Sequence, residues 1–418
     1  MKIDDKTSHN SPSIRFPEFT GEWEKCKVSD LLDFYPTNSL SWDKLEYGTN
    51  AIQNLHYGLI HVGLPTMVDL SKDKLPNVVN GNTPKNYELC QEGDVAFADA
   101  SEDTNEVAKA VEFYNLNGNK AICGLHTIHG RDNHQRTIVG YKGYAFSSIS
   151  FHHQIRRIAQ GTKIYSINCK NFSECYVGIP SKEEQSKIAT LLRLIDERIA
   201  VQSRLIDRLQ SLMIGLNNSL YEQYGNDITT SFMELGYSYS GLSGKSAKDF
   251  GSGKPFITYL NVYSNIIVDE TDYQYVRIND GEKQNIVRTG DVLFTLSSET
   301  PEEVGIGSVY LGEKEVYLNS FCFGIHIERN QLAYSPYLSY YVTSTAFRKF
   351  IYPFAQGSTR FNLCKADFEK ASIKLPSLDN QKRISAMLDC IAEKIRAEKA
   401  ILEYYNIQRQ YLLRQMFI

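Results

Sequence analysis

The chain lacks an excess of basic residues and has no long hydrophobic run. Its 418 residues carry 45 Lys and Arg against 49 Asp and Glu, which gives a formal net charge of −4. A chain that neutralises DNA phosphates by itself usually contains a basic domain, so this balance argues against nucleic-acid binding without partners. Apolar runs such as 292–294 fall far short of the roughly 18–20 residues of a membrane span, so we expect no membrane partner.

Export signals and paired cysteines are also missing. Residues 1–13 are polar and have no apolar core of a signal peptide, so we expect a flexible tail there. The eight cysteines form no CxxC pair and no zinc-finger spacing, which predicts reduced thiols in a cytoplasmic protein. They are Cys26, Cys90, Cys123, Cys169, Cys175, Cys322, Cys364 and Cys390.

The sequence contains none of the common catalytic motifs. Residues 251–254 resemble a phosphate-binding loop, but Pro255 stands where Ser or Thr is required. The spacing of the residues in a histidine-rich loop does not match any standard metal site, so we predict no metal ligand there. Since no catalytic motif is present either, we predict no catalytic residue. That loop contains His126, His129, Asp132 and His134.

The chain is an internal duplication. Residues 159–222 align with 355–418 at a shift of 196 residues, without a gap. A second block, 93–97 with the sequence Gly-Asp-Val-Ala-Phe, aligns with Gly-Asp-Val-Leu-Phe at 290–294 at a shift of 197. Two blocks in the same order at nearly the same shift indicate a tandem repeat.

Each half has a mixed part followed by a long helix. Short β-branched and aromatic runs, such as 257–260 and 266–268, predict strands of a small α+β domain. We therefore expect a tail over 1–13, mixed domains over 14–179 and 227–375, and helices over 180–226 and 376–418.

The two helices are predicted by heptad spacing. Ser181 and Glu184 form a capping-box pattern at the start of the first helix. Apolar residues then alternate in steps of three and four, and a tandem repeat favours pseudo-two-fold symmetry, so we expect an antiparallel coiled coil. The predicted pairing residues are Ile188, Leu192, Ile195, Ile199, Ile206, Leu209, Leu216, Ile384, Leu388, Ile391, Ile395, Leu402 and Leu412.

The repeated Gly-Asp-Val block has two interpretations. Asp94 and Asp291 could be catalytic carboxylates. The favoured interpretation is a turn entering a strand, in which Gly takes a positive φ and Asp bonds the local backbone.

Several motifs recur in both halves in one fixed order. Gly-Asp-Val-x-Phe is followed by Ala-Gln-Gly at 159–161 and 355–357, then by Phe, Pro-Ser and Gln. Together with the opening Arg15–Phe19 and Gly21–Trp23, these motifs resemble the specificity subunit of type I DNA restriction–modification systems. The resemblance covers residues from about Arg15 to Phe417.

The resemblance implies a non-catalytic subunit of α+β fold, with two target-recognition domains that each bind half of a split site in double-stranded DNA. It further implies docking of methyltransferase subunits, two of them, and of restriction–translocase subunits. S-adenosylmethionine, ATP and Mg would belong to those partners, and this chain would bind no cofactor. The alternatives are a coiled-coil scaffold that does not contact DNA, or a silent or recombination-donor allele.

Polar loops are the candidates for DNA contact. Arg pairs well with guanine, and Asn or Gln with adenine, in the major groove. The candidates are Asn38, Ser39, Ser41, Lys44, Arg131, Asn133, Gln135, Ser240, Ser243, Lys245, Ser246, Lys248, Ser358, Thr359 and Arg360.

Overall fold

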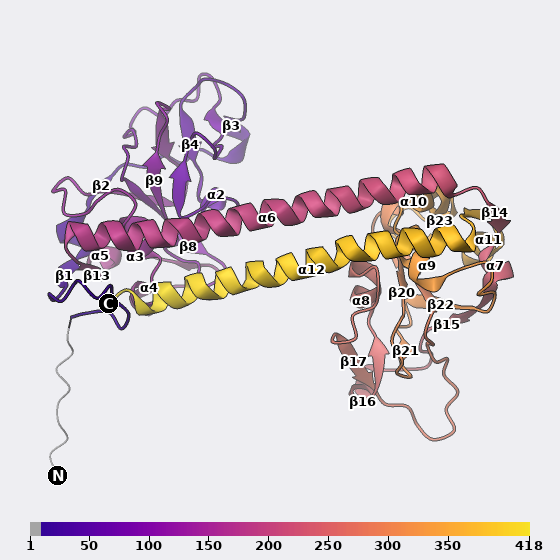
Figure 1. Ribbon diagram of the computed structural model, residues 1–418. Coiled ribbons are helices and arrows are strands. Elements are labelled where there is room, and N and C mark those ends of the chain that lie inside the picture. Colours follow the sequence, from indigo (N-terminus) through magenta and orange to yellow (C-terminus); the bar gives the residue numbers. More distant parts are fainter. Residues whose placement is uncertain (1–9) are drawn as a thin grey trace, which may run out of the picture. The chain divides into compact units, whose positions relative to one another are not determined.

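The computed structural model describes residues 10–418, so most of the predicted tail lies outside the described residues. The chain forms two compact units. Unit 1 comprises the residues up to Ser203 together with Ala400–Ile418, and unit 2 comprises Arg204–Lys399. Two long helices, α6 (Lys182–Tyr224) and α12 (Leu378–Gln415), each contribute one part to each unit (Figure 1). Within 10–418, no helix combines the length and the apolar character needed to cross a membrane.

Unit 1 is built on a five-stranded sheet of order β2-β11-β7-β9-β5 and a four-stranded sheet of order β10-β4-β6-β3. The pairs β1-β13 and β8-β12 complete it. Its strands are β1 (Glu24–Lys27), β2 (Asp33–Tyr35), β3 (Leu45–Glu46), β4 (Gln53–Leu55), β5 (Met67–Asp69), β6 (Asn77–Val78), β7 (Val95–Ala98), β8 (Ala100–Ser101), β9 (Ala110–Asn115), β10 (Ala121–Cys123), β11 (Thr127–Arg131), β12 (Tyr165–Ser166) and β13 (Tyr176–Ile179). Its shorter helices are α1 (Val28–Leu31), η1 (Trp42–Lys44), α2 (Tyr57–His61), α3 (Lys142–Phe146), α4 (Ile149–Ile158) and α5 (Cys169–Ser173).

Unit 2 repeats this plan with sheets of order β15-β22-β18-β20, β17-β16-β21, β14-β25 and β19-β24-β23. Its strands are β14 (Ile228–Thr230), β15 (Gly236–Ser240), β16 (Phe250–Ile257), β17 (Tyr273–Val276), β18 (Val292–Thr295), β19 (Ser297–Ser298), β20 (Gly307–Val309), β21 (Tyr317–Leu318), β22 (Cys322–Ile327), β23 (Ala355–Gln356), β24 (Phe361–Leu363) and β25 (Ile373–Leu375). Its shorter helices are α7 (Phe232–Leu235), η2 (Ala247–Asp249), α8 (Tyr259–Ser264), η3 (Pro301–Glu303), α9 (Ser335–Tyr341), α10 (Thr345–Ile351), η4 (Tyr352–Phe354) and α11 (Lys365–Lys370).

Two predicted strands are corrected by the structure. Of residues 257–260, only Ile257 lies in a strand, because the Thr258 side chain accepts a hydrogen bond from the Asn261 amide and caps α8. In 266–268, only Ile267 forms an isolated bridge, to Val309. At 258–260 local capping therefore overrides the β propensity of the residues.

The long helices pair in antiparallel fashion, which confirms the predicted coiled coil. In unit 1 the start of α6 meets the end of α12, where Ile188 and Leu192 share a core with Leu413, Met416 and Phe417. In unit 2 the end of α6 packs on the same hydrophobic cluster as the start of α12. All the predicted pairing residues are buried or half-buried.

Two polar residues, Glu398 and Arg409, stand at heptad positions of α12, where they interrupt the apolar pattern, and both have partners. Arg409 forms an ion pair with Asp196 of α6, with 2.5 Å between Nε and Oδ1, and donates to Thr66. Lys394 forms an ion pair with the buried Glu398 one turn away on the same helix. The Arg409 pair lies between the two helices of unit 1, so the break in the seam adds an interhelical contact there.

A buried glutamine fixes the beginning of each long helix to its unit. Gln185 accepts a hydrogen bond from the Ile138 amide at 2.9 Å and donates to the carbonyls of Arg136 and Pro180. Gln381 makes the equivalent bonds, accepting from Tyr334 at 2.8 Å and donating to the carbonyls at 332 and 376. Both glutamines are fully buried. Each half of the chain therefore has a glutamine at this place, where it pairs with backbone groups in the interior of its unit.

Replacement of this glutamine by an apolar residue of similar size should loosen one unit. In Gln381→Met, three buried backbone groups lose their partner, and we expect unit 2 to lose roughly 3 kcal/mol of stability. Hydrogen exchange of the full chain measures this loss, with the amides of unit 1 as internal reference. Lys382→Met, at an exposed position, is the control, and equal protection in the two variants would contradict the role given to Gln381.

Candidate nucleic-acid interface

The Gly-Asp-Val blocks form turns, as the favoured interpretation predicted. Gly93 and Gly290 have φ of 89° and 92°, a region that favours glycine. Asp94 accepts a hydrogen bond from the Gln91 amide at 2.8 Å, and Asp291 accepts one from the Arg288 amide at 2.8 Å. Both carboxylates are buried, so neither presents a catalytic group to solvent.

Each of these carboxylates also pairs with a buried histidine. His129 Nε2 lies 2.7 Å from Asp94, and His326 Nδ1 lies 2.7 Å from Asp291. The histidines lie on β11 and β22, the strands next to β7 and β18 in each sheet. The separation is 35 residues in both halves, a signal in the sequence that the motif comparison did not use.

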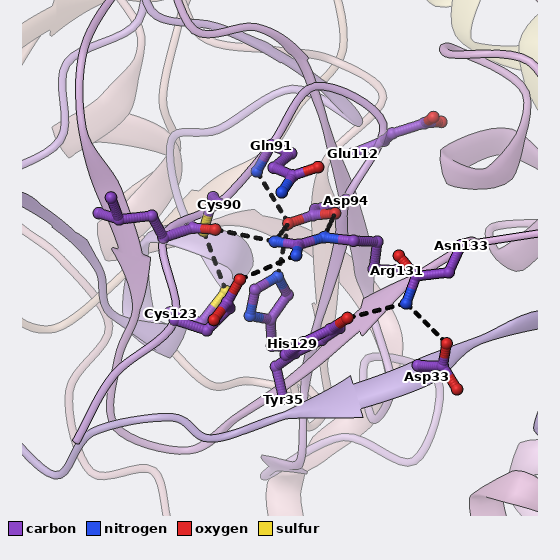
Figure 2. A network of polar contacts seen from close by, with 12 residues as sticks. Asp33, Tyr35, Cys90, Gln91, Asp94, Glu112, Cys123, His129, Arg131 and Asn133 are labelled. Carbon is purple, nitrogen blue, oxygen red and sulfur yellow. Dashed lines mark hydrogen bonds and ion pairs between the residues drawn. The ribbon is translucent and has the colours of Figure 1, made fainter.

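In unit 1 a buried arginine completes the network (Figure 2). Arg131 contacts both oxygens of Asp94 at 2.8 Å, and also donates to Glu88 and to the Leu89 carbonyl. Its guanidinium lies over the Tyr35 ring, 4.4 Å from the centroid. Burial alone would raise the pKa of Asp94, but the hydrogen bonds from Arg131 and His129 outweigh it and lower that pKa.

In unit 2 a tyrosine from the neighbouring strand β15 completes the network instead of an arginine. Tyr239 donates to Asp291 at 2.7 Å and stacks on His326. Burial raises the pKa of Asp291, and the bonds from Arg288, Tyr239 and His326 offset only part of that effect. Burial and the neighbouring Asp291 charge also raise the pKa of Tyr239. Both units therefore bury a carboxylate, but the groups that face it differ in charge. The guanidinium of Arg131 faces Asp94 in unit 1, and the neutral hydroxyl of Tyr239 faces Asp291 in unit 2.

Two candidate DNA contacts of unit 1 hold the structure together instead. Arg131 directs its donors inward, which corrects the expectation that it contacts bases. Asn38 is buried and donates to the Cys123 carbonyl at 2.9 Å, so it too is structural. The other candidates are exposed: Ser39, Ser41, Lys44, Asn133 and Gln135.

Several exposed candidates of unit 1 are already engaged with neighbouring side chains. Ser41 and Lys44 both contact Asp43. Asn133 donates to Asp33 and to the Tyr35 hydroxyl.

Unit 2 presents more of its candidates to solvent. Lys245 is the exception, because its half-buried ammonium group donates to the Arg277 carbonyl and to Glu282, whose pKa it lowers to about 2. Ser246 bonds Asp249 in a capping box at η2. The remaining candidates are exposed: Ser240, Ser243, Lys248, Ser358, Thr359 and Arg360.

The turns after each Ala-Gln-Gly sequence have the same backbone. Gly161 and Gly357 have φ of 138° and 141°, and an added Cβ would lie 1.9 and 2.1 Å from the carbonyl oxygens of Ile164 and Arg360. Each turn leads to a short strand, β12 in unit 1 and β24 in unit 2, which pairs with β8 or β19 respectively. The turns are therefore equivalent in backbone, while their exposed side chains differ.

An aromatic cluster of unit 1 brings together residues that are distant in the sequence. Tyr57 packs edge-on against His61 and His126, and all three line a cleft of about 610 Å³. Ile164, from the turn just described, lines the same cleft with Lys109. Glu102, Asp103 and Glu106 line the cleft too, and Lys109 is paired with Glu106 at 2.8 Å, so the charge of this cleft does not favour contact with phosphates. The spacing of these residues gives no recognisable motif.

Comparisons with known proteins agree with this geometry. Residues 242–404 match the family model of the type I restriction modification DNA specificity domain. A stretch of 150 residues is 27% identical to the type I restriction enzyme StySPI specificity subunit of Salmonella potsdam. This stretch is 36% of the chain and spans 32% of that relative's length.

Two solved structures resemble the chain over most of its length. An S subunit of a type I restriction–modification system from M. genitalium superposes with a TM-score of 0.53 at 15% identity, covering 98% of this chain and 99% of that one. A chain from a study of complex assembly and conformational transition of the type I restriction–modification system gives 0.58 at 17% identity, covering 94% and 96%. At these identities the likeness establishes the fold.

The duplicated fold, the equivalent turns and the matched domain confirm the resemblance drawn from the motifs. Residues 242–404 match the type I restriction modification DNA specificity domain, and the whole chain is similar in fold to an S subunit of such a system.

The different charge balance of the two carboxylate networks gives a testable asymmetry. Asp94→Asn removes the buried carboxylate that accepts from both Arg131 and His129 and leaves Arg131 with Glu88 as its remaining acidic partner, and we expect unit 1 to lose about 3–5 kcal/mol. Asp291→Asn is the matched control, because its amide oxygen still accepts from Tyr239, and we expect roughly 1–2 kcal/mol. Hydrogen exchange resolved by unit measures both, and equal losses would refute the asymmetry.

Proposed function

We propose that this chain is the DNA sequence-specificity subunit of a type I restriction–modification complex, in which each unit reads one half of a bipartite target. One observation carries the proposal. The two units repeat the same buried anchors, namely the Asp–His pair, the glutamine and the glycine turn, while their exposed loops differ. A repeated frame with different surfaces suits two different half-sites.

The long helices are the proposed docking region for two methyltransferase subunits and for restriction–translocase subunits. Large apolar side chains remain exposed on α6 and α12 in both units, which supports burial by a protein partner. They include Leu194, Val201, Tyr404 and Tyr411 in unit 1, and Leu212, Ile214 and Met387 in unit 2. The net charge of −4 fits a reader whose partners supply much of the phosphate contact.

In this proposal the chain is not itself an enzyme. S-adenosylmethionine, ATP and Mg act in the partner subunits, and the assembled complex is the adenine-N6 DNA methyltransferase and site-specific deoxyribonuclease. The complex works in the cytoplasm. The alternatives are a scaffold without DNA contact and a silent or recombination-donor allele, neither of which alters the DNA modification of a cell.

A methylation map of the genome tests the proposal. In cells that carry the cognate methyltransferase, we expect a split adenine-methylated motif that appears only when this gene is present. Expression of the methyltransferase and its binding to this chain are confirmed in parallel. If both hold and no motif appears, the specificity function is refuted and the scaffold or silent allele stands.

Arg360 provides a sharper test of the second unit. It is exposed on the turn after Gly357, so Arg360→Ala should leave the fold intact. We expect the variant to relax one position of the half-site read by unit 2, or to reduce the salt slope of binding by about one, with the other half-site unchanged. Lys370→Ala removes an exposed charge from α11 as control, and identical maps together with identical salt slopes for the two variants would exclude Arg360 from the interface.

A further inference from the structure

Two cysteines and a histidine that are distant in sequence converge in the core of unit 1. The Sγ atoms of Cys90 and Cys123 lie 3.7 Å apart, and both thiols are buried. Together with His129, their possible ligand atoms all lie within 4.8 Å of one another. The spacing of these residues in the sequence matches no standard metal site and therefore predicts none. Figure 2 shows the cluster beside the Asp94 network.

One ring nitrogen of His129 forms a hydrogen bond, and the other forms none within residues 10–418. Nε2 of His129 is bonded to Asp94 at 2.7 Å, and the side chain is fully buried. Nδ1 is also buried, and no group within residues 10–418 forms a hydrogen bond with it. Figure 2 shows this second nitrogen on the side of the ring that faces Cys123. Histidines that bind metals commonly donate their other N–H to a carboxylate, the arrangement seen here.

Unit 2 shows that the frame does not require these thiols. The Cys90 amide donates to the Ala121 carbonyl, and the Val287 amide donates to the Val316 carbonyl in the equivalent bridge. Val287 and Leu318 therefore stand where unit 1 has Cys90 and Cys123, and both are buried in an apolar cluster. The Asp–His pair is present in both units, but only unit 1 places two thiols beside it.

We propose that unit 1 binds one zinc ion through Cys90 Sγ, Cys123 Sγ and His129 Nδ1. A tetrahedral ion with Zn–S bonds of about 2.3 Å places its two sulfurs about 3.8 Å apart, which matches the observed separation. Thiolate and imidazole ligands favour zinc over magnesium or calcium. Three protein ligands leave the fourth position for a water molecule.

The binding step balances in charge and atoms. Each thiol loses its proton to solvent as its sulfur bonds the ion, so two S–H bonds are replaced by two S–Zn bonds and two protons are released. The neutral imidazole of His129 donates its Nδ1 lone pair to the ion. Its Nε2 keeps its proton, which is hydrogen-bonded to Asp94. Arg131 adds no uncompensated positive charge, because Asp94 and Glu88 both pair with it.

The ion would join three segments of unit 1. Cys90 precedes β7, Cys123 ends β10 in the four-stranded sheet, and His129 lies on β11 in the five-stranded sheet. A zinc ion at this point ties the two sheets together. Its role is structural and is independent of the proposed DNA specificity, so failure of one proposal leaves the other standing.

Metal analysis of the purified full chain tests the site. We expect one zinc per chain by native mass spectrometry after dialysis against metal-free buffer, and cobalt substitution should produce thiolate-to-cobalt charge-transfer absorption. Cys90→Val combined with Cys123→Leu introduces the residues that unit 2 already uses, and we expect it to lose the metal. Cys169→Ala, which removes an exposed thiol outside the cluster, should retain it.

Three results would overturn the proposal. The first is a folded wild-type chain with reduced thiols that takes up no zinc when zinc is added. The second is zinc that stays bound in the double variant, which places the metal elsewhere. The third is a disulfide between Cys90 and Cys123 in chain purified under reducing conditions. The first and third results come from the wild-type chain, so the test survives poor folding of the variant.

Discussion

The burial of one glutamine side chain at the start of each long helix organises both units. Pro180 and Pro376 end the mixed part of each half, and a backbone loop packs against the helix at that point. The loop and the proline expose backbone groups that neither strands nor helices satisfy. Gln185 and Gln381 satisfy them, because an amide side chain both accepts and donates. The helix therefore has a fixed place on its own unit.

The Asp–His pair is the second buried contact that both units share. The residues that surround this pair differ between the units. In each half the carboxylate closes a turn through a backbone amide and reaches a histidine on the next strand. Arg131 in one unit and Tyr239 in the other then complete the shell. A duplicated frame can thus keep its geometry while its polar core and its loops change, as the proposed reading of two different half-sites requires.

The candidate interface was only partly accessible to prediction. Repeated glycines identified the turns at 93 and 290, because a positive φ leaves a signature in residue type. Arg131, Asn38 and Lys245 looked like surface residues, since Arg, Asn and Lys are usually exposed. Their partners come from segments distant in sequence, so burial of their polar groups could not be foreseen. The aromatic cluster around Tyr57 arises in the same way.

The sequence alone determined the duplication, the two helices and their antiparallel pairing, because heptad spacing and repeated blocks are local or periodic properties of the chain. The tertiary structure decided where the polar side chains go. Arg131 was predicted at the surface but lies in the core, and residues 266–268 form one bridge instead of the expected strand. Cys90, Cys123 and His129 lie together although they are distant in the sequence. Such convergence depends on how sheets pack, and strand packing brings together residues whose sequence spacing carries no period.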